Sequence, residues 1–183
     1  MAVEQLNQMN EAVLPMMRRT NPNRIVFLGG LQWMNPNWQT ANKWAMAIPK
    51  LSDGSVDPQL ALEIHNYDPP QYAMCKTASV CKFGRTWGTA ADLSSLDAWM
   101  GAIKAWSQTH HLPIYYGEFG CTHARNASTG RDVWYAAHAA AIQKHGFAAS
   151  VWDDDGMFRV FDRNADTWDV GVLKALGKQK PVV

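Results

Sequence analysis

The chain has 183 residues, 47% of them hydrophobic, and its 17 Lys and Arg nearly balance 16 Asp and Glu. This length predicts one domain over residues 1–183, and the composition predicts a packed core rather than disorder. A formal net charge of +1 without a basic block argues against nucleic acid as a partner. No apolar run approaches the ~18 residues of a membrane helix, and the first segment lacks the basic-then-apolar order of a signal peptide. We therefore expect a soluble chain without an export signal or membrane contact, and a neutral partner.

Helical and strand patterns alternate along the chain. An apolar stripe of Leu6, Met9, Val13 and Met16 or Met17 predicts a first helix, which ends before an apolar strand over 25–28. Further strands are expected over 60–67, 112–118 and 147–152, with helices over 93–106 and 130–145 between them. Gly146 suits the end of the 130–145 helix, and a last helix is expected over 172–176.

This alternation predicts the fold class. Strands that alternate with helices give right-handed crossovers and a parallel sheet, and nearly continuous apolar strands fit a sheet covered by helices. Four such units make half of a (βα)8 barrel. We expect an α/β fold, half of a (βα)8 TIM barrel.

Tryptophan and cysteine add two observations. Nine Trp are unusual, because a partly exposed indole offers a flat apolar face that suits a sugar ring, although most Trp residues are part of a core. Among the three Cys, Cys75 and Cys81 are close enough in sequence to close a loop in an oxidising compartment, leaving Cys121 unpaired. Three free thiols are the equal alternative.

In a βα barrel the reactive side chains lie at the carboxyl ends of the strands, so polar residues there are the candidates. Glu118 ends an apolar strand between two glycines, which favours a functional carboxylate over a structural one. Side chains two positions apart share a face, so Glu63, His65 and Tyr67 are expected to point inward, although His65 alone also fits a core imidazole. The other strand-end candidates are Gln32, Trp33, Asn35, Trp152, Asp153, Asp154 and Asp155.

Four segments follow one another along the chain in an order typical of a known family: Asn21-Pro22-Asn23-Arg24-Ile25-Val26, His65-Asn66-Tyr67-Asp68-Pro69, Pro113-Ile114-Tyr115-Tyr116-Gly117-Glu118-Phe119-Gly120, and Trp152. In this order and spacing they resemble the second half of the family 5 glycoside hydrolases, the cellulase family. The most specific part is the Gly-Glu-Phe-Gly strand end around Glu118. The likeness covers nearly the whole chain and implies a single catalytic-type domain that corresponds to strands five to eight of the family's barrel.

The resemblance implies a retaining β-glycosidase that acts on a β-linked oligo- or polysaccharide such as cellulose, related β-glucans or mannans. Glu118 is then the nucleophile that forms a glycosyl-enzyme intermediate, hydrogen-bonded by the matching Tyr, and the matching Trp is a sugar platform. No metal or organic cofactor is expected, because two carboxyl groups and a cleft suffice for this chemistry. The family is commonly secreted, so the compartment stays open. The implied substrate-binding positions are His65, Tyr67, Trp152 and, more loosely, Trp33 and Asn35.

The match departs from the family at its acid/base. That residue is a Glu in an Asn-Glu-Pro motif at the end of the fourth barrel strand, and the sequence contains no Asn-Glu-Pro. Asn10-Glu11-Ala12 lies within the first helical stripe and is no substitute. We therefore expect the first four strands to be absent, together with the acid/base and the Arg that supports the nucleophile. Positioned acid catalysis is worth ~10²–10⁴-fold in rate.

An isolated half-barrel leaves two unpaired edges and an uncovered apolar inner face. We therefore expect a homodimer or higher homo-oligomer that closes eight strands around a two-fold axis. The partner's last strand then fills the slot of the missing fourth strand. One of Asp153, Asp154 and Asp155 from the partner becomes the best positional replacement for the acid/base. A solvated or capping loop is the alternative for these three aspartates.

Three functional accounts remain open. The chain is a hydrolase that works as an oligomer or alongside the missing strands, or a carbohydrate-binding remnant without turnover. The third account is a truncated folding unit with neither activity.

Overall fold

The computed structural model describes residues 2–35, 46–75, 86–125 and 130–178. At its centre lies one sheet of four parallel strands in the order β1 (Val26–Gly29), β2 (Leu60–Asn66), β3 (Ile114–Phe119) and β4 (Ala148–Val151). The expected α/β class with a parallel sheet is confirmed. The strand ends differ from those predicted by no more than two residues, because the apolar runs extend slightly beyond the paired backbone.

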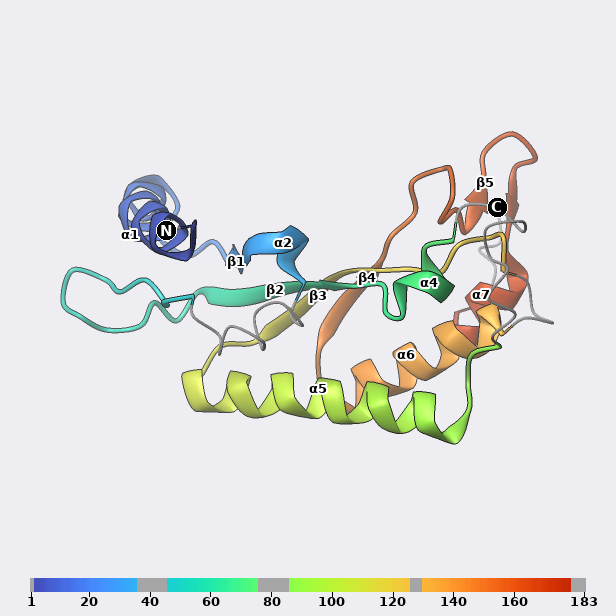
Figure 1. Cartoon of the computed structure of the whole chain (residues 1–183). Coiled ribbons are helices and arrows are strands. Elements are labelled where there is room, and N and C mark those ends of the chain that lie inside the picture. Colours follow the sequence, from blue (N-terminus) through green and yellow to red (C-terminus); the bar gives the residue numbers. More distant parts are fainter. Residues whose placement is uncertain (1, 36–45, 76–85, 126–129, 179–183) are drawn as a thin grey trace.

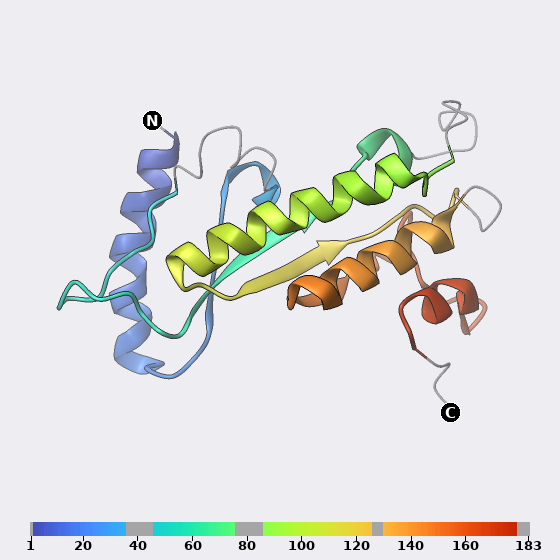
Figure 2. The same ribbon diagram turned by 90° about the horizontal axis from the view of Figure 1, so that it is seen from below.

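Two long helices cover one face of the sheet (Figures 1 and 2). They are α5 (Ala90–His110) and α6 (Arg131–His145). Reciprocal hydrogen bonds between Thr89 and Asp92 begin α5, and Gly146, in the left-handed conformation, ends α6 as predicted. The core between helices and sheet includes Leu62, Ile64, Tyr116, Phe119, Met100, Ile103 and Trp134.

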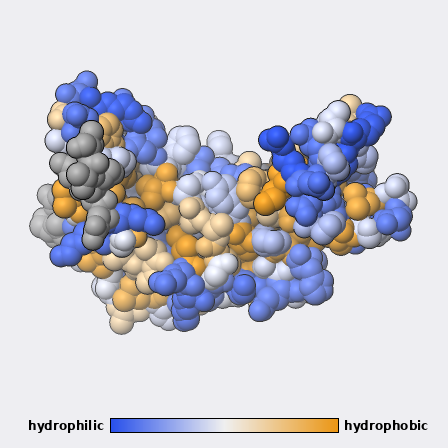
Figure 3. Space-filling model, turned by 180° about the vertical axis from the view of Figure 1, so that it is seen from behind, coloured by the Kyte–Doolittle hydropathy of each residue, from blue (hydrophilic) through white to orange (hydrophobic). Residues whose placement is uncertain are grey.

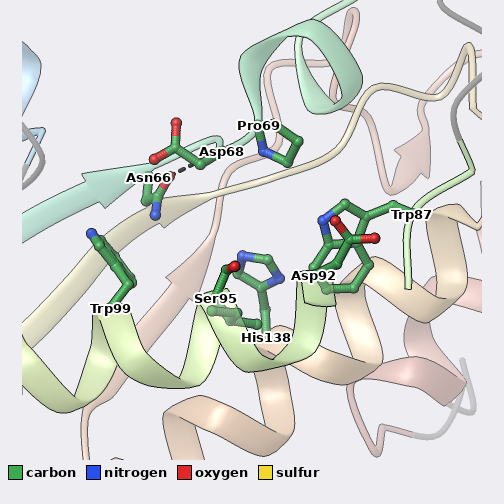
Figure 4. A pocket seen from close by; sticks show the side chains of 9 residues that line it. Asn66, Asp68, Pro69, Trp87, Asp92, Ser95, Trp99 and His138 are labelled. Atoms are coloured by element: carbon green, nitrogen blue, oxygen red, sulfur yellow. Dashed lines mark hydrogen bonds between the residues drawn. The ribbon is translucent and has the colours of Figure 1, made fainter. Parts of the chain in front are cut away.

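A cavity of about 310 Å³ remains in this helix-covered layer, near the carboxyl end of β2. Figure 4 shows His138 of α6 and Ser95 of α5 facing this space below Asn66 of β2. His138 is buried, and its Nδ1–H donates to the carbonyl oxygen of Trp134, while Nε2 meets no hydrogen-bond partner within the described ranges. Burial lowers the pKa of His138 to about 3, so the imidazole is neutral near pH 7.

The opposite face of the sheet is not covered by a helix layer in the described part of the chain (Figure 1). The long α1 (Ala2–Thr20) lies at one end of the molecule; the β5 (Phe161–Asp162) and β6 (Thr167–Trp168) hairpin and α7 (Val170–Ala175) lie at the other. Figure 3 shows hydrophobic residues gathered in the depression between the two more hydrophilic ends. Ile25 and Phe27, 57% and 44% exposed, are large apolar side chains at β1.

The helix α1 corrects one sequence expectation. Of its predicted apolar stripe, Met9, Val13 and Met16 are exposed, whereas Leu6 is partly buried against the core. Leu14 is the buried residue of the helix. The helix is instead held to the β1–β2 region by Arg18, which pairs with Asp57 and donates to nearby backbone carbonyls.

Some short features lay outside the sequence prediction. These are the turn α2 (Leu31–Met34), the single turn α4 (Pro70–Ala73) and the β5–β6 hairpin. Cys75 is disulfide-bonded and Cys121 is a free, buried thiol, while Cys81 lies outside the described residues. Within the described ranges no helix has the length and apolarity needed to cross a membrane.

The buried His138 predicts an acid-sensitive fold. Its pKa falls from 6.5 to about 3 on folding, so between these values the unfolded chain binds a proton that the folded chain does not. Stability is therefore lost as the pH falls through this window, by about 2 kcal/mol between pH 7 and pH 5 from this residue alone. Urea unfolding at both pH values measures the loss, which a His138→Phe variant lacks. Equal losses in both proteins would contradict the prediction.

Candidate active site

The carboxyl ends of the strands border a cavity of about 420 Å³ on the open face of the sheet. Because parallel strands end at the same edge, residues distant in sequence meet there. The cavity brings together six of the nine predicted site residues. Its lining is Gln32, Trp33, Asn35, His65, Tyr67, Asp68, Pro70, Met74, Glu118, Trp152 and Phe158.

A β-bulge in β3 turns Glu118 toward this cavity. Ile64 of β2 pairs with Tyr116, yet the next residue, His65, pairs with Glu118, so Gly117 is an extra residue in β3. Tyr116 is fully buried on the helix-covered face, and strict alternation would place Glu118 on that face too. The extra residue reverses this parity, as bulges beside active sites commonly do.

Two side chains from β2 and its end contact the Glu118 carboxylate. The phenol of Tyr67 donates a hydrogen bond to Oε2 at 2.7 Å, and Nδ1 of His65 lies 3.4 Å from the same oxygen. Burial, and then the hydrogen bond to Glu118, raise the pKa of Tyr67 well above its usual value. Tyr67 therefore remains a protonated donor, and the carboxylate of Glu118, a quarter exposed, is held by it.

Aromatic faces surround the carboxylate. Trp152 follows β4, and its backbone N–H donates to the carbonyl of Phe119, which holds the Trp152 backbone beside the end of β3. Phe158 packs against Tyr67 with ring centroids 5.0 Å apart. Trp33, which also lines the cavity, is 85% exposed. Exposed indoles beside a carboxylate suit a sugar ring.

The turn that presents Trp33 is conformationally costly. Three successive residues, Gln32, Trp33 and Met34, have φ between 53° and 59°. This left-handed region costs roughly 1–2 kcal/mol for each residue other than glycine. Such outliers gather at functional sites, where the surrounding structure compensates for them.

The three aspartates after Trp152 do not line the cavity in this chain. The Asp153 carboxylate accepts hydrogen bonds from three backbone N–H groups of its own loop, and that of Asp154 from two. Partial burial acts to raise the pKa of Asp153, but the backbone hydrogen bonds and Arg163 outweigh it and lower the pKa. Asp155 pairs with Arg163 at 3.0 Å. For Asp153, the lowered pKa is the reverse of what a general acid requires.

Sequence reasoning missed Asp68, Pro70, Met74 and Phe158 as cavity residues. All four lie outside the expected strands, and the folded loops bring them to the cavity. In the described residues no group of three His, Cys, Asp or Glu side chains is arranged to hold a metal ion.

Comparison with known proteins shows which family the chain resembles. The family Cellulase (glycosyl hydrolase family 5) matches residues 2–156. The chain belongs to the cellulase family. It is 33% identical over 179 residues to endoglucanase H of Acetivibrio thermocellus, which covers 94% of this chain and 18% of that protein.

Solved structures share the fold of this cellulase-family chain. Endoglucanase Cel5A of Thermotoga maritima superposes with a TM-score of 0.81 at 24% identity, over 95% of this chain and 54% of that one. Cellulose synthase subunit Z of Clostridioides difficile superposes with a TM-score of 0.79 at 23% identity, over 95% of this chain and 56% of that one. The chain thus spans about half the length of the solved structures it matches and less than a fifth of endoglucanase H.

The sequence Asn10-Glu11-Ala12 is helical, within α1, as predicted for this cellulase-family chain. A Glu in the middle of a helix, far from the strand ends, has no access to the cavity. Glu11 is not among the residues that line the cavity.

The loop contacts of Asp153 predict a stability effect. Asp153→Asn removes one acceptor oxygen and turns an NH₂ group toward backbone donors, so we expect the free energy of unfolding to fall by about 1–2 kcal/mol. Urea unfolding at pH 7 measures it. Asp155→Asn is the matched control, because its exposed ion pair with Arg163 contributes under about 1 kcal/mol. Equal losses in the two variants would contradict the proposed difference.

Proposed function

We propose that this chain hydrolyses β-1,4-glycosidic bonds in cellulose or related β-glucans, with Glu118 as the nucleophile of a retaining mechanism. Its membership of the cellulase family supports the reaction class. The observation that supports the nucleophile is the Glu118 carboxylate, turned into an aromatic-rimmed cavity with Tyr67 donating to Oε2.

In this proposal Glu118 attacks the anomeric carbon of a sugar bound against Trp152, and the glycosidic oxygen leaves with the bonding electron pair. Tyr67 donates a hydrogen bond to Oε2 of the carboxylate, which orients it toward the sugar, and Nδ1 of His65 lies 3.4 Å from the same oxygen. Trp33 and Asn35, which also line the cavity, contact a neighbouring sugar unit. Water then releases the sugar from the glycosyl-enzyme.

We further propose that residues 1–183 form one catalytic-type domain equivalent to strands five to eight of the family's barrel. A second copy of this chain supplies the other four strands of the barrel. The two edge strands β1 and β4 have no further partner strand among the described residues. The exposed Ile25 and Phe27 on the sheet and Met9, Val13 and Met16 on α1 supply apolar surface of the kind that protein interfaces bury.

In such a two-fold assembly, an aspartate of the partner's loop after β4 serves as acid/base. Asp155 is the best of the three, because its contact is an exposed ion pair, whereas Asp153 and Asp154 are committed to backbone N–H groups of their own loop.

A second candidate is carbohydrate binding without turnover. The exposed indoles of Trp33 and Trp152 favour it, since stacking on a sugar needs no acid/base. This candidate predicts a change in Trp fluorescence with cello-oligosaccharides and no release of reducing ends.

An activated substrate tests the nucleophile separately from the acid. Dinitrophenolate leaves without protonation, so dinitrophenyl β-cellobioside needs only Glu118 for the first step. We expect a burst of one dinitrophenolate per chain followed by slow turnover, and no burst from Glu118→Gln. Rapid-mixing absorbance measures both.

The exposed Glu11→Gln variant is the control and keeps the burst. A burst of wild-type size in Glu118→Gln would show that Glu118 is not the nucleophile. Fluorescence titration without any burst would favour the binding candidate.

Subunit complementation tests the assembly. We expect a solution mass of at least two chains. Mixing equal amounts of the inactive Glu118→Gln and Asp155→Asn proteins is expected to restore about a quarter of wild-type hydrolysis of a soluble β-glucan, because half of the dimers are mixed and each mixed dimer has one intact site of two. Light scattering and reducing-end release measure these outcomes. Asp153→Asn and Asp154→Asn are paired with Glu118→Gln in the same way. A strict monomer, or no recovery in all three pairings, would contradict closure by a second copy.

A further inference from the structure

The imidazole of His65 lies between two carboxylates. Its Nδ1 is 3.4 Å from Oε2 of Glu118, and its Nε2 is 3.1 Å from Oε1 of Glu63. Glu63 and His65 are two positions apart on β2, so both side chains point to the open face of the sheet. The ring thus connects a carboxylate at the cavity with one deeper in the sheet.

Glu63 does not line the cavity, and its side chain is 23% exposed. It therefore has no place to touch a sugar. We propose that Glu63 is a positioning residue that orients His65, and through it Glu118; this rests on the nucleophilic role proposed above.

The chemistry of the contact fixes the ring. An ionised carboxylate only accepts hydrogen bonds, so Nε2 of His65 must donate to Glu63. A charge-assisted hydrogen bond of this kind selects one ring orientation, with the Nδ1 edge toward Glu118. Without Glu63 the imidazole is free to rotate or flip, and Oε2 of Glu118 keeps Tyr67 as its one oriented neighbour. Holding a reacting group by such a supporting contact is a common way to preserve attack geometry.

Gly117 supplies an independent observation. A Cβ at this position would overlap Oε1 of Glu63, and its three nearest neighbours are all atoms of the Glu63 side chain. The φ of Gly117 lies outside the left-handed region, so its backbone conformation does not require glycine. The lack of a side chain in the bulge therefore leaves room for Glu63 beneath His65.

A spectroscopic test is independent of turnover. The Nε2–H proton of His65, hydrogen-bonded and largely buried, is expected as a slowly exchanging NMR signal, assigned by its loss in His65→Gln. We expect the signal to persist in Glu63→Gln, whose amide oxygen still accepts, and to disappear in Glu63→Ala. A signal that persists in Glu63→Ala overturns the proposal, whether or not the protein hydrolyses glycans.

A kinetic test uses the rate of the dinitrophenolate burst. Glu63→Ala is expected to slow the burst about 10- to 100-fold with little change in substrate affinity, because misplacement of a reacting group affects the bond-making step. Glu63→Gln is expected to recover most of this rate. A wild-type burst rate in Glu63→Ala, or a loss confined to affinity, overturns the proposal.

A double-variant cycle separates Glu63 from a direct effect on Glu118. Gly117→Ala displaces Glu63 and is expected to slow the burst as much as Glu63→Ala does. The double variant Glu63→Ala/Gly117→Ala is expected to have the same burst rate as Glu63→Ala alone, since without the Glu63 side chain the new Cβ meets no clash. Gly101→Ala is the matched control, because a Cβ there meets its nearest neighbour, His145, at an ordinary 3.7 Å. Additive losses in the double variant overturn the proposal.

Discussion

The candidate site depends on one extra residue in the third strand. Gly117 shifts the register between β2 and β3 by one, which brings Glu118 opposite His65 and onto the open face of the sheet. The residue before the bulge, Tyr116, packs beneath α5, and the residue after Glu118, Phe119, packs on α6. Buried rings on both sides of the bulge fix the direction of the carboxylate, since neither ring can leave the core cheaply.

The same sheet has two faces of different character. One is covered by α5 and α6 and includes a fully buried, neutral His138. The other is open in the described chain, and the apolar side chains of α1 and β1 are exposed near it. In the solved relatives this chain corresponds to about half of the polypeptide. Exposed apolar surface of this kind is what the proposed pairing with a second copy would bury.

Several site residues were predictable because their positions follow from strand ends. His65, Tyr67, Glu118 and Trp152 each lie at or just after an apolar run, and parallel strands bring such positions to one edge. The exposure of Met9, Val13 and Met16 on α1 was not predictable, since their spacing is that of a buried helix face. Phe158 was also missed, because a loop residue reaches the cavity only through the contacts of its own loop.

The four parallel strands, their helices and the family follow from the sequence, because hydrophobic periodicity and strand-end motifs are local properties of the chain. The direction of Glu118 and the groups around it depend on the folded sheet. Strict alternation would direct Glu118 to the same face as Tyr116, and nothing in the local sequence specifies that Gly117 is unmatched in the neighbouring strand. Register is set by the packing of β2, β3 and β4 against the helices, and that packing exists only in the folded sheet.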